Sequence, residues 1–147
     1  MNSIDEDLTV IQHLNLFVKL SGIPKDIRVQ AINEIVEACL LQGFENTKPE
    51  GMSRGQIRRL TPAMALVGRP ELVILDHPFE CVDPLTKRKL MKTIMSFTEN
   101  STLFMATNDI EVAEFICDRI AIMNKGKFVA IGSVGELIKT HGRGYAV

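Results

Sequence analysis

The sequence predicts an α/β fold with a parallel-sheet core and a group of helices that precedes it. In the first third of the chain, apolar residues recur with the 3.6-residue period of amphipathic helices. After Gly51, short apolar runs alternate with helical segments, which is typical of parallel strands joined by crossover helices. The chain has 147 residues, 46% of them apolar, which is enough for one hydrophobic core of ordinary size.

Two amphipathic helices are expected before residue 44. The first covers residues 9–20, with Thr9 as its N-cap, and ends near Gly22. The second begins at Pro24, because proline favours the first turn of a helix, and ends before Gly43. These helices are expected to pack through their apolar stripes.

The region after the second helix is expected to contain a linker and a third helix. Residues 44–51 are polar and include Pro49, so they are interpreted as a linker between two packing units. A helix follows Ser53, and Pro62 within it is expected to kink or break it.

One βαβ unit is expected in the middle of the chain. Residues 72–75 and 102–106 are continuous apolar runs of strand length, as expected for strands covered on both faces. Residues 84–97 carry apolar positions at helical spacing and should form the crossover helix. Farther on, residues 120–123 and 128–131 flank a glycine-containing turn and predict a hairpin.

Composition excludes several classes of protein. There are 17 basic and 18 acidic side chains, so the net charge of -1 favours neither nucleic acid nor an anionic membrane as a partner. The chain shows no run of the roughly 18–20 apolar residues that a direct membrane span needs, and no signal-peptide pattern at its start. Cys39, Cys81 and Cys117 form no CxxC pair, so we expect buried thiols and neither disulfides nor structural zinc.

Acidic residues follow the first predicted strand directly. Asp76, His77, Glu80 and Asp83 share one loop, and a carboxylate at a strand end suits hydrated magnesium. The alternative is that Asp76 caps a turn and Asp83 caps the helix that begins at Pro84. Both interpretations remain open from these residues alone.

Two further segments could bind an anion. Ser53, Arg54, Gly55 and Gln56 open a helix, where a hydroxyl, unpaired backbone N–H groups and the helix dipole favour phosphate. Alternatively, Ser53 only caps its helix and the arginines form a solvated basic face. Asn108 follows the second strand, where Asp109 could simply be the N-cap of a helix over residues 110–117.

These segments follow one another in an order and at a spacing that resemble those of the motifs in the ATP-binding domain of ABC transporters. Residues 52–56, M-S-R-G-Q, resemble the LSGGQ signature, and residues 72–76 resemble the Walker B strand. Residues 80–83, E-C-V-D, resemble the D-loop, and residues 105–108 look like the strand that leads into the switch-histidine loop. Residues 110–123 are similar to the family stretch M-E-E-A-E-x-L-C-D-R-I-A-I-M, so the resemblance covers nearly the whole chain. Residues Gly142, Arg143, Gly144 and Tyr145 near the end of the sequence resemble the corresponding segment of the lipid-exporting A-subfamily.

The resemblance implies a partial P-loop NTPase-like domain and a set of roles. In that family, two nucleotide-binding domains hold ATP between them, head to tail. Asp76 would then be the magnesium-side carboxylate, Ser53 and Gly55 would cover the γ-phosphate, Gln56 would hold the signature turn, and Asp83 would reach across the interface. Residues 1–52 would be the helical subdomain and residues 53–147 the signature, Walker B, D-loop and switch part.

The resemblance also implies partners and a location. The helices over residues 9–41 would dock on the transporter's membrane domains, and a second nucleotide-binding domain would complete the site. The cofactors would be ATP and Mg²⁺, bound only if a partner supplies a P-loop. The chain would be cytoplasmic and peripheral to a membrane through its partner subunits.

Four departures from the family pattern bear on catalysis. No G-x-x-x-x-G-K-[ST] motif occurs in the chain. His77 stands where the family has its general base glutamate, Asn108 replaces the switch histidine, and Arg54 replaces the first signature glycine. Hydrolysis is therefore expected to be weak or absent without a partner.

The first residues suggest what precedes them in the family. Leu8 and Thr9 would lie just beyond the Q-loop glutamine, so the P-loop and Q-loop would be upstream of Met1. Three interpretations remain. The first is that the chain is an ATP-binding component of an ABC transporter, with lipids as the substrate class that the A-subfamily resemblance implies. The second is a catalytically inactive interaction module, and the third is a truncated gene product.

Overall fold

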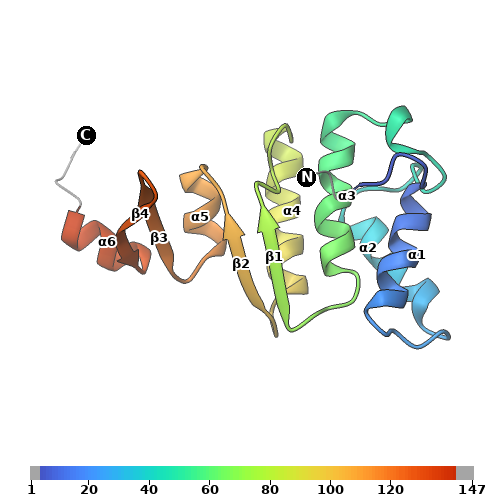
Figure 1. Cartoon of the computed structure of the whole chain (residues 1–147), viewed down its shortest axis with the longest axis horizontal. Coiled ribbons are helices and arrows are strands. Elements are labelled where there is room, and N and C mark those ends of the chain that lie inside the picture. The colour runs from blue at the N-terminus through green and yellow to red at the C-terminus, as the bar shows by residue number, and fades with distance from the viewer. Residues whose placement is uncertain (1–3, 142–147) are drawn as a thin grey trace. The chain divides into compact units, whose positions relative to one another are not determined.

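A computed structural model describes residues 4–141 of the chain. The chain divides into two compact units, Met1–Ala106 and Thr107–Val147. Figure 1 shows the order of the elements along the chain. The first unit holds the predicted helices and the βαβ unit, and the second holds the predicted hairpin. The division expected at residues 52 and 53 assigns family subdomains, and it stays a prediction.

The first helix, α1 (Val10–Leu20), begins and ends as its sequence predicts. Thr9 and Gln12 form a reciprocal capping box, because each side chain accepts a hydrogen bond from the other's backbone N–H. At the other end, Gly22 has a φ of 71°, and the Ile23 N–H donates to the Val18 carbonyl over 3.1 Å. Glycine adopts this left-handed conformation without steric cost, so it stops the helix there.

The second helix, α2 (Arg28–Ala38), is shorter than predicted at both ends. It begins after a turn at residues 24–27, so Pro24 is not its first residue. It also ends before Gly43, because Leu40 takes a left-handed φ of 56° and the Leu41 N–H donates to the Val36 carbonyl over 2.8 Å. The hydrogen-bond pattern is that of a glycine-stopped helix, but a leucine holds the left-handed position.

Residues 44–51 are held against α1, which corrects the expected linker. The N–H groups of Val10 and Ile11 donate to the carbonyls of Thr47 and Glu45, over 3.1 Å and 2.9 Å. A short 3₁₀ helix, η1 (Pro49–Gly51), follows. The segment therefore belongs to the first unit and supplies acceptors for the first turn of α1.

The third helix, α3 (Arg54–Leu66), runs through Pro62 without the predicted break. Proline removes one backbone donor, so the Arg58 carbonyl lacks its usual partner at residue 62. Pro62 is buried, and so are Leu60, Ala63, Met64 and Leu66 around it. Burial of this apolar face maintains the helix despite the missing hydrogen bond.

The predicted βαβ unit is confirmed. Strand β1 (Leu72–Asp76) pairs in parallel with β2 (Thr102–Ala106), with Leu72 opposite Thr102 and Asp76 opposite Ala106. Helix α4 (Pro84–Phe97) connects the two strands. The carboxyl ends of both strands therefore lie at the same edge of the sheet, which is where sites form in parallel sheets.

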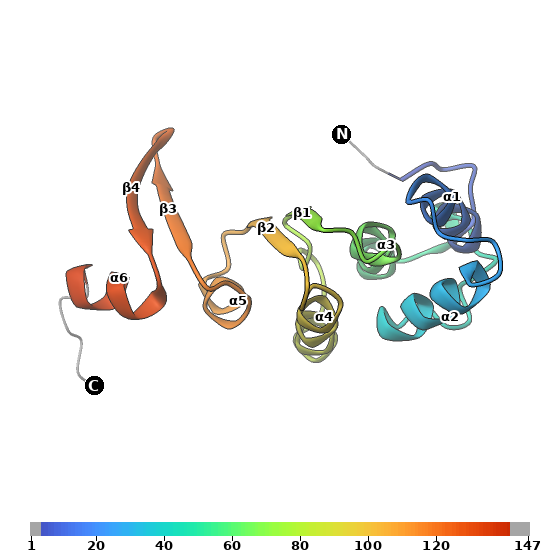
Figure 2. The ribbon, with the colours of Figure 1, turned by 90° about the horizontal axis from the view of Figure 1, so that it is seen from below.

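The two strands are covered on one face only, which corrects the expectation of coverage on both. In β1, Val73 and Leu75 are buried, whereas Leu72 and Ile74 are 54% and 66% exposed. On the same open face of β2, Phe104 is 67% exposed. Figure 2 shows α4 on one side of the two strands, with no element of the first unit on the other.

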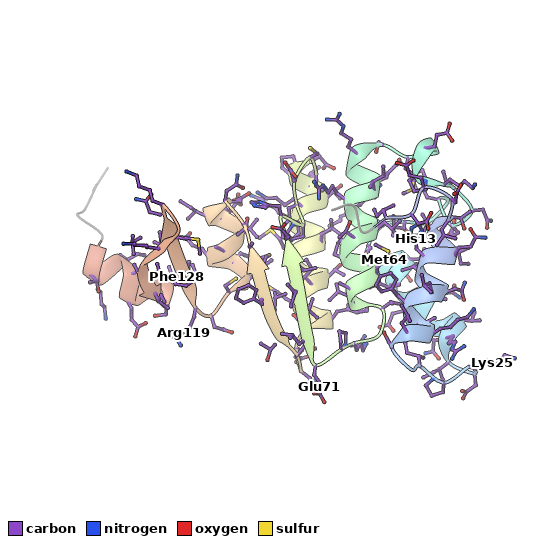
Figure 3. The ribbon with its side chains drawn as sticks, viewed as in Figure 1. His13, Lys25, Met64, Glu71, Arg119 and Phe128 are labelled. Atoms are coloured by element: carbon purple, nitrogen blue, oxygen red, sulfur yellow. The ribbon has the colours of Figure 1, made fainter. Side chains whose placement is uncertain are left out.

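The core of the first unit joins the helices to the covered face of the sheet. Most of its members are buried apolar residues, and two polar residues, His13 and Thr98, are buried with them. Figure 3 shows His13 and Met64 on the neighbouring helices α1 and α3. The largest fully buried side chains include Leu14, Ile35, Leu41, Leu60, Leu66, Leu90, Met91 and Ile94. This shared core fixes α3 and α4, which carry the candidate site.

The second unit contains the predicted hairpin between two helices. Its elements are α5 (Ile110–Ile116), β3 (Ile120–Asn124), β4 (Lys127–Gly132) and α6 (Val134–His141). The strands are antiparallel, and Lys125 and Gly126 form the turn with positive φ values of 47° and 75°. Residues 142–145, which resemble the A-subfamily ending, lie outside the described residues.

No helix within residues 4–141 combines the length and the apolar character needed to cross a bilayer.

Candidate functional site

A pocket of about 430 Å³ lies within the first unit, between the start of α3 and the loop that joins β1 to α4. Residues 53–56 and Arg59 line one side, and residues 81–83 and Thr86 line the other. The predicted signature residues and Asp83 are 25 or more positions apart in sequence. The fold therefore brings two of the three predicted segments together.

Ser53 and Gln56 hold the first turn of α3. The Ser53 Oγ accepts from the Gln56 N–H over 3.3 Å, and the Gln56 Oε1 accepts from the Ser53 N–H over 2.7 Å. This confirms that Ser53 caps its helix, and Gln56 completes the capping box. The role of both residues in a signature turn stays a prediction. Because the cap uses Ser53 as an acceptor, the hydroxyl hydrogen stays able to donate to an anion.

Gly55 allows the two loops to approach each other. A Cβ atom at this position would lie 3.2 Å from the Cys81 carbonyl oxygen, which is closer than most such contacts. That oxygen belongs to the backbone, so it can yield less than the end of a flexible side chain. A side chain at position 55 would therefore have to displace this loop by a few tenths of an ångström, which glycine avoids.

The three arginines near the start of α3 have different surroundings. The Arg58 Nη2 donates to the Glu80 Oε2 over 2.6 Å, which ties α3 to the loop after β1. The Arg59 guanidinium donates to the Leu40 carbonyl. Arg54 is exposed, lines the pocket, and has no hydrogen-bond or ion-pair partner among residues 4–141. The predicted basic face is therefore only partly solvated.

The loop between β1 and α4 is shaped by two non-glycine residues with left-handed backbone. His77 has a φ of 46° and Cys81 has a φ of 60°. The His77 N–H donates to the Ala106 carbonyl over 2.9 Å, and Phe79 is buried beneath the loop. These anchors direct Cys81 and Asp83 toward α3, and they place Asp76 and His77 at the strand end.

Asp83 caps α4, as one of the two interpretations predicted. Its Oδ1 accepts from the Thr86 N–H over 3.0 Å. Hydrogen bonds from the Thr86 side chain and from the Thr86 N–H lower the pKa of the Asp83 carboxyl, because they stabilise its charged form. Asp83 therefore stays ionised at neutral pH while it lines the pocket.

Asp76 and His77 lie at the carboxyl end of β1, outside the pocket lining. The Asp76 side chain is 84% exposed, and its Oδ1 is 3.9 Å from the His77 Nε2. Residues 4–141 contain no cluster of three or more His, Cys, Asp or Glu side chains able to hold a metal ion. One exposed carboxylate still suits Mg²⁺, which commonly takes one or two protein carboxylates together with phosphates and waters.

Asn108 belongs to the second unit and is exposed. Asp109, beside it, caps α5 by accepting from the Val112 N–H over 3.3 Å, as predicted. The role of Asn108 beside a γ-phosphate stays a prediction.

The cysteines differ from one another, which corrects the expectation that all three are buried. Cys39 is fully buried, and its burial raises the pKa of the thiol to about 12. Cys117 is half-buried, and burial raises its pKa as well. Cys81 is exposed at the pocket.

Sequence reasoning did not predict Arg59, Cys81, Val82 and Thr86 as site residues, although all four line the pocket. Helical spacing carried a signal for two of them. Arg59 lies three positions after Gln56 on α3, and Thr86 lies three positions after the Asp83 cap, so each shares a helix face or first turn with a predicted residue. Cys81 had no such signal, because its exposure depends on the left-handed backbone of its loop.

The chain is similar to large ABC transporters over nearly its whole length, although no family model matches it. It is 34% identical to the human glucosylceramide transporter ABCA12 over 148 residues, which cover 99% of this chain and 6% of the transporter. It is also 34% identical to the bovine retinal-specific phospholipid-transporting ATPase ABCA4 over 147 residues, with the same coverage. The chain therefore spans about one seventeenth of the length of these relatives.

Two solved structures share its fold. One is an ATP-binding subunit of an ABC transporter, with a TM-score of 0.85 and 23% identity. The other is a dimeric bacterial ABC transporter cassette, with a TM-score of 0.80 and 24% identity. Each comparison covers 97% of this chain and 60% of the solved chain.

Proposed function

Because this chain is a homologue of the A-subfamily ABC transporters and has the fold of an ABC ATP-binding subunit, we propose that it is an ATP-binding component of an ABC transporter assembly. It contributes the signature and Walker B part of a nucleotide site, and a partner contributes the P-loop. Its task is to couple the binding of ATP to movement of a substrate across a membrane.

The pocket between residues 53–56 and residues 81–83 is the observation that carries this proposal. The resemblance assigns both segments to the surface that faces ATP held by another domain. Their juxtaposition is consistent with that role, because a capped helix N-terminus and a serine hydroxyl are suited to a phosphate. Gly55 supports it further, because the absence of a side chain there allows the two segments to lie close together.

ATP and Mg²⁺ would be bound only together with the partner's P-loop. Asp76 would hold the hydrated Mg²⁺ through its exposed carboxylate, and Ser53 and Gly55 would face the γ-phosphate. The ion would neutralise phosphate charge. In this arrangement, the chain binds and orients the triphosphate but does not enclose it.

Hydrolysis at this site is proposed to be slow or absent. His77 stands in place of a glutamate, and an imidazole differs from a carboxylate in shape and reach. Asn108 can donate a hydrogen bond to a phosphate oxygen but carries no charge. The site therefore favours ATP binding over turnover.

The helical part of the first unit is proposed to dock on transporter membrane domains at the cytoplasmic face of a membrane. Exposed apolar side chains gather at the end of α1 and the start of α2, where Leu20, Ile27 and Val29 are 72%, 45% and 68% exposed. Such a surface suits a protein partner. ABCA12 and ABCA4 are named for lipid substrates, so a lipid is the proposed class of transported molecule.

A second candidate is an interaction module without an ATP-dependent role. It is favoured by the replacement of two catalytic positions and one signature glycine, at His77, Asn108 and Arg54. This candidate predicts partner binding that is the same with ATP, ADP or no nucleotide.

The two candidates are separated by measuring association with a partner. We suggest sedimentation velocity of the full chain mixed with an isolated nucleotide-binding domain of an A-subfamily ABC transporter that has an intact P-loop. The first candidate predicts a complex with Mg-ATP that is weaker by an order of magnitude or more with Mg-ADP. Equal association in every nucleotide state would favour the interaction module, and tight Mg-dependent ATP binding by the chain alone would contradict the proposal.

A further inference from the structure

We propose that Arg54 is an anion-binding residue of the pocket, and that its guanidinium contacts the terminal phosphate of a nucleotide presented by the partner. This inference rests on the proposed function and assigns a new role to one residue of the same site. Its consequence is selectivity, since a triphosphate would reach this side chain and a diphosphate would lack the terminal group.

The first step is that Arg54 has no hydrogen-bond or ion-pair partner among the described residues, unlike the two other arginines near the start of α3. Arg58 is paired with Glu80, and Arg59 donates to the Leu40 carbonyl. Arg54 is exposed, and within residues 4–141 nothing pairs with it. Its charge is therefore available to a ligand that enters the pocket.

The second step is the charge balance of the pocket walls. Arg54 and Arg59 are the cations, and Asp83 is the anion. The Leu40 carbonyl that Arg59 contacts is neutral, so the charge of Arg59 is not compensated there. The Asp83 carboxylate already accepts hydrogen bonds from the Thr86 side chain and the Thr86 N–H, which lower its pKa. The walls therefore carry an excess of one positive charge, and they favour an anion.

The third step is that positions 54 and 55 face different constraints. A side chain at position 55 would press against the Cys81 carbonyl, whereas Arg54 projects from the first turn of α3 as an exposed side chain. Within the described residues, Arg54 is therefore exposed and has no partner. Arg54 is one of the exposed residues that line the pocket, and a guanidinium can form two parallel hydrogen bonds to phosphate oxygens.

The alternative to phosphate binding is steric obstruction, in which the long Arg54 side chain keeps a partner domain away from residues 53–56. The two effects predict opposite signs for Arg54→Gly. If the guanidinium contacts phosphate, glycine weakens nucleotide-dependent binding; if it obstructs, glycine strengthens that binding. Arg54→Lys keeps the charge but loses the planar fork, so it should fall between wild type and glycine.

The first experiment uses the full chain and inorganic tripolyphosphate. NMR titration should shift the backbone amides of residues 53–56, with an affinity that falls as NaCl rises from 50 to 200 mM. Arg54→Gly should weaken this binding roughly tenfold, whereas Arg54→Lys should weaken it less than about threefold. Arg88→Ala is the matched control, because Arg88 is exposed on α4, is not part of the pocket lining, and has no partner among the described residues.

The second experiment repeats the Mg-ATP association with the P-loop domain for the same variants. Weaker association of Arg54→Gly, with Arg88→Ala unchanged, supports the inference. Stronger or unchanged association of Arg54→Gly, or unchanged tripolyphosphate binding, would overturn it while leaving the proposed function intact. If the wild-type chain does not associate at all, the proposed function fails, and the tripolyphosphate titration still decides whether Arg54 binds anions.

Discussion

At the residue scale, the start of α3 combines a structural role with a candidate binding role. Ser53 uses its lone pair to cap the helix, and its hydroxyl hydrogen can still serve a ligand. Asp83 has a similar pair of roles, because it caps α4 and also lines the pocket. Substitutions at these residues therefore change stability as well as binding, and the two effects have to be measured separately.

Replacing Ser53 with alanine should lower the free energy of unfolding by about 1 kcal/mol, because the Gln56 N–H loses its acceptor. Urea denaturation followed by circular dichroism measures this change. Ser53→Asn is the control, since asparagine caps helices as well as serine does and should change stability by only a few tenths of a kcal/mol. Equal losses in both variants would show that the cap is not the cause.

Asp83 should stabilise the fold in a pH-dependent way. Its folded-state pKa is lowered from 3.8, so its contribution is present above the unfolded-state pKa and is lost as pH falls through the folded-state value. The difference in stability between wild type and Asp83→Asn should therefore be constant near pH 7 and shrink below about pH 4. Denaturant midpoints measured from pH 7 to pH 2.5 test this. A difference that grows on acidification would contradict it.

At the element scale, the βαβ unit fixes the geometry of the site. Parallel pairing of β1 and β2 sets the strand ends at one edge, and α4 continues from the loop that lines the pocket. The sheet is covered on one face, so successive side chains of β1 alternate between exposed and buried. This alternation leads to a matched pair of predictions.

Leu75→Ala should cost about 2–5 kcal/mol of stability, because the leucine is only 3% exposed in the core. Ile74→Thr, at the adjacent position on the open face, should change stability by less than about 0.5 kcal/mol. It should also reduce self-association, because an exposed apolar strand favours contact between chains. Urea denaturation and light scattering measure the two effects. A large loss of stability in Ile74→Thr would mean that something covers that face.

The hairpin turn offers a prediction within the second unit. Lys125 and Gly126 both have positive φ, which asparagine tolerates better than lysine at the first position. Lys125→Asn should therefore stabilise the hairpin by up to about 1 kcal/mol. Amide hydrogen exchange of β3 and β4 would show it as slower exchange. Faster exchange would indicate that Lys125 makes a contact that asparagine cannot replace.

Much of this architecture could be predicted from sequence, because periodicity and capping residues act locally. The βαβ unit, the hairpin and the caps at Thr9, Ser53 and Asp83 were predicted. The end of α2 was not, since a leucine at residue 40 takes the conformation that usually indicates glycine. The continuity of α3 at Pro62 and the open face of β1 depend on tertiary packing, which sequence patterns do not report.

At the scale of the whole molecule, the chain corresponds to a small part of its relatives. It covers 6% of ABCA12 and 60% of a solved ATP-binding subunit. The pocket belongs to the first unit, and Asn108 belongs to the second. In the function proposed above, a partner supplies the P-loop that completes this site.

The most direct test of this dependence is paramagnetic NMR of the full chain with Mn-ATP in place of Mg-ATP. In the presence of a P-loop domain from an A-subfamily transporter, the amide signals of Ser53, Gly55 and Asp76 should broaden strongly. Without the partner they should stay sharp, and signals of α2 should stay sharp in both conditions. Complex formation without broadening at Ser53 and Gly55, or equal broadening when the partner is left out, would contradict a site completed by the partner.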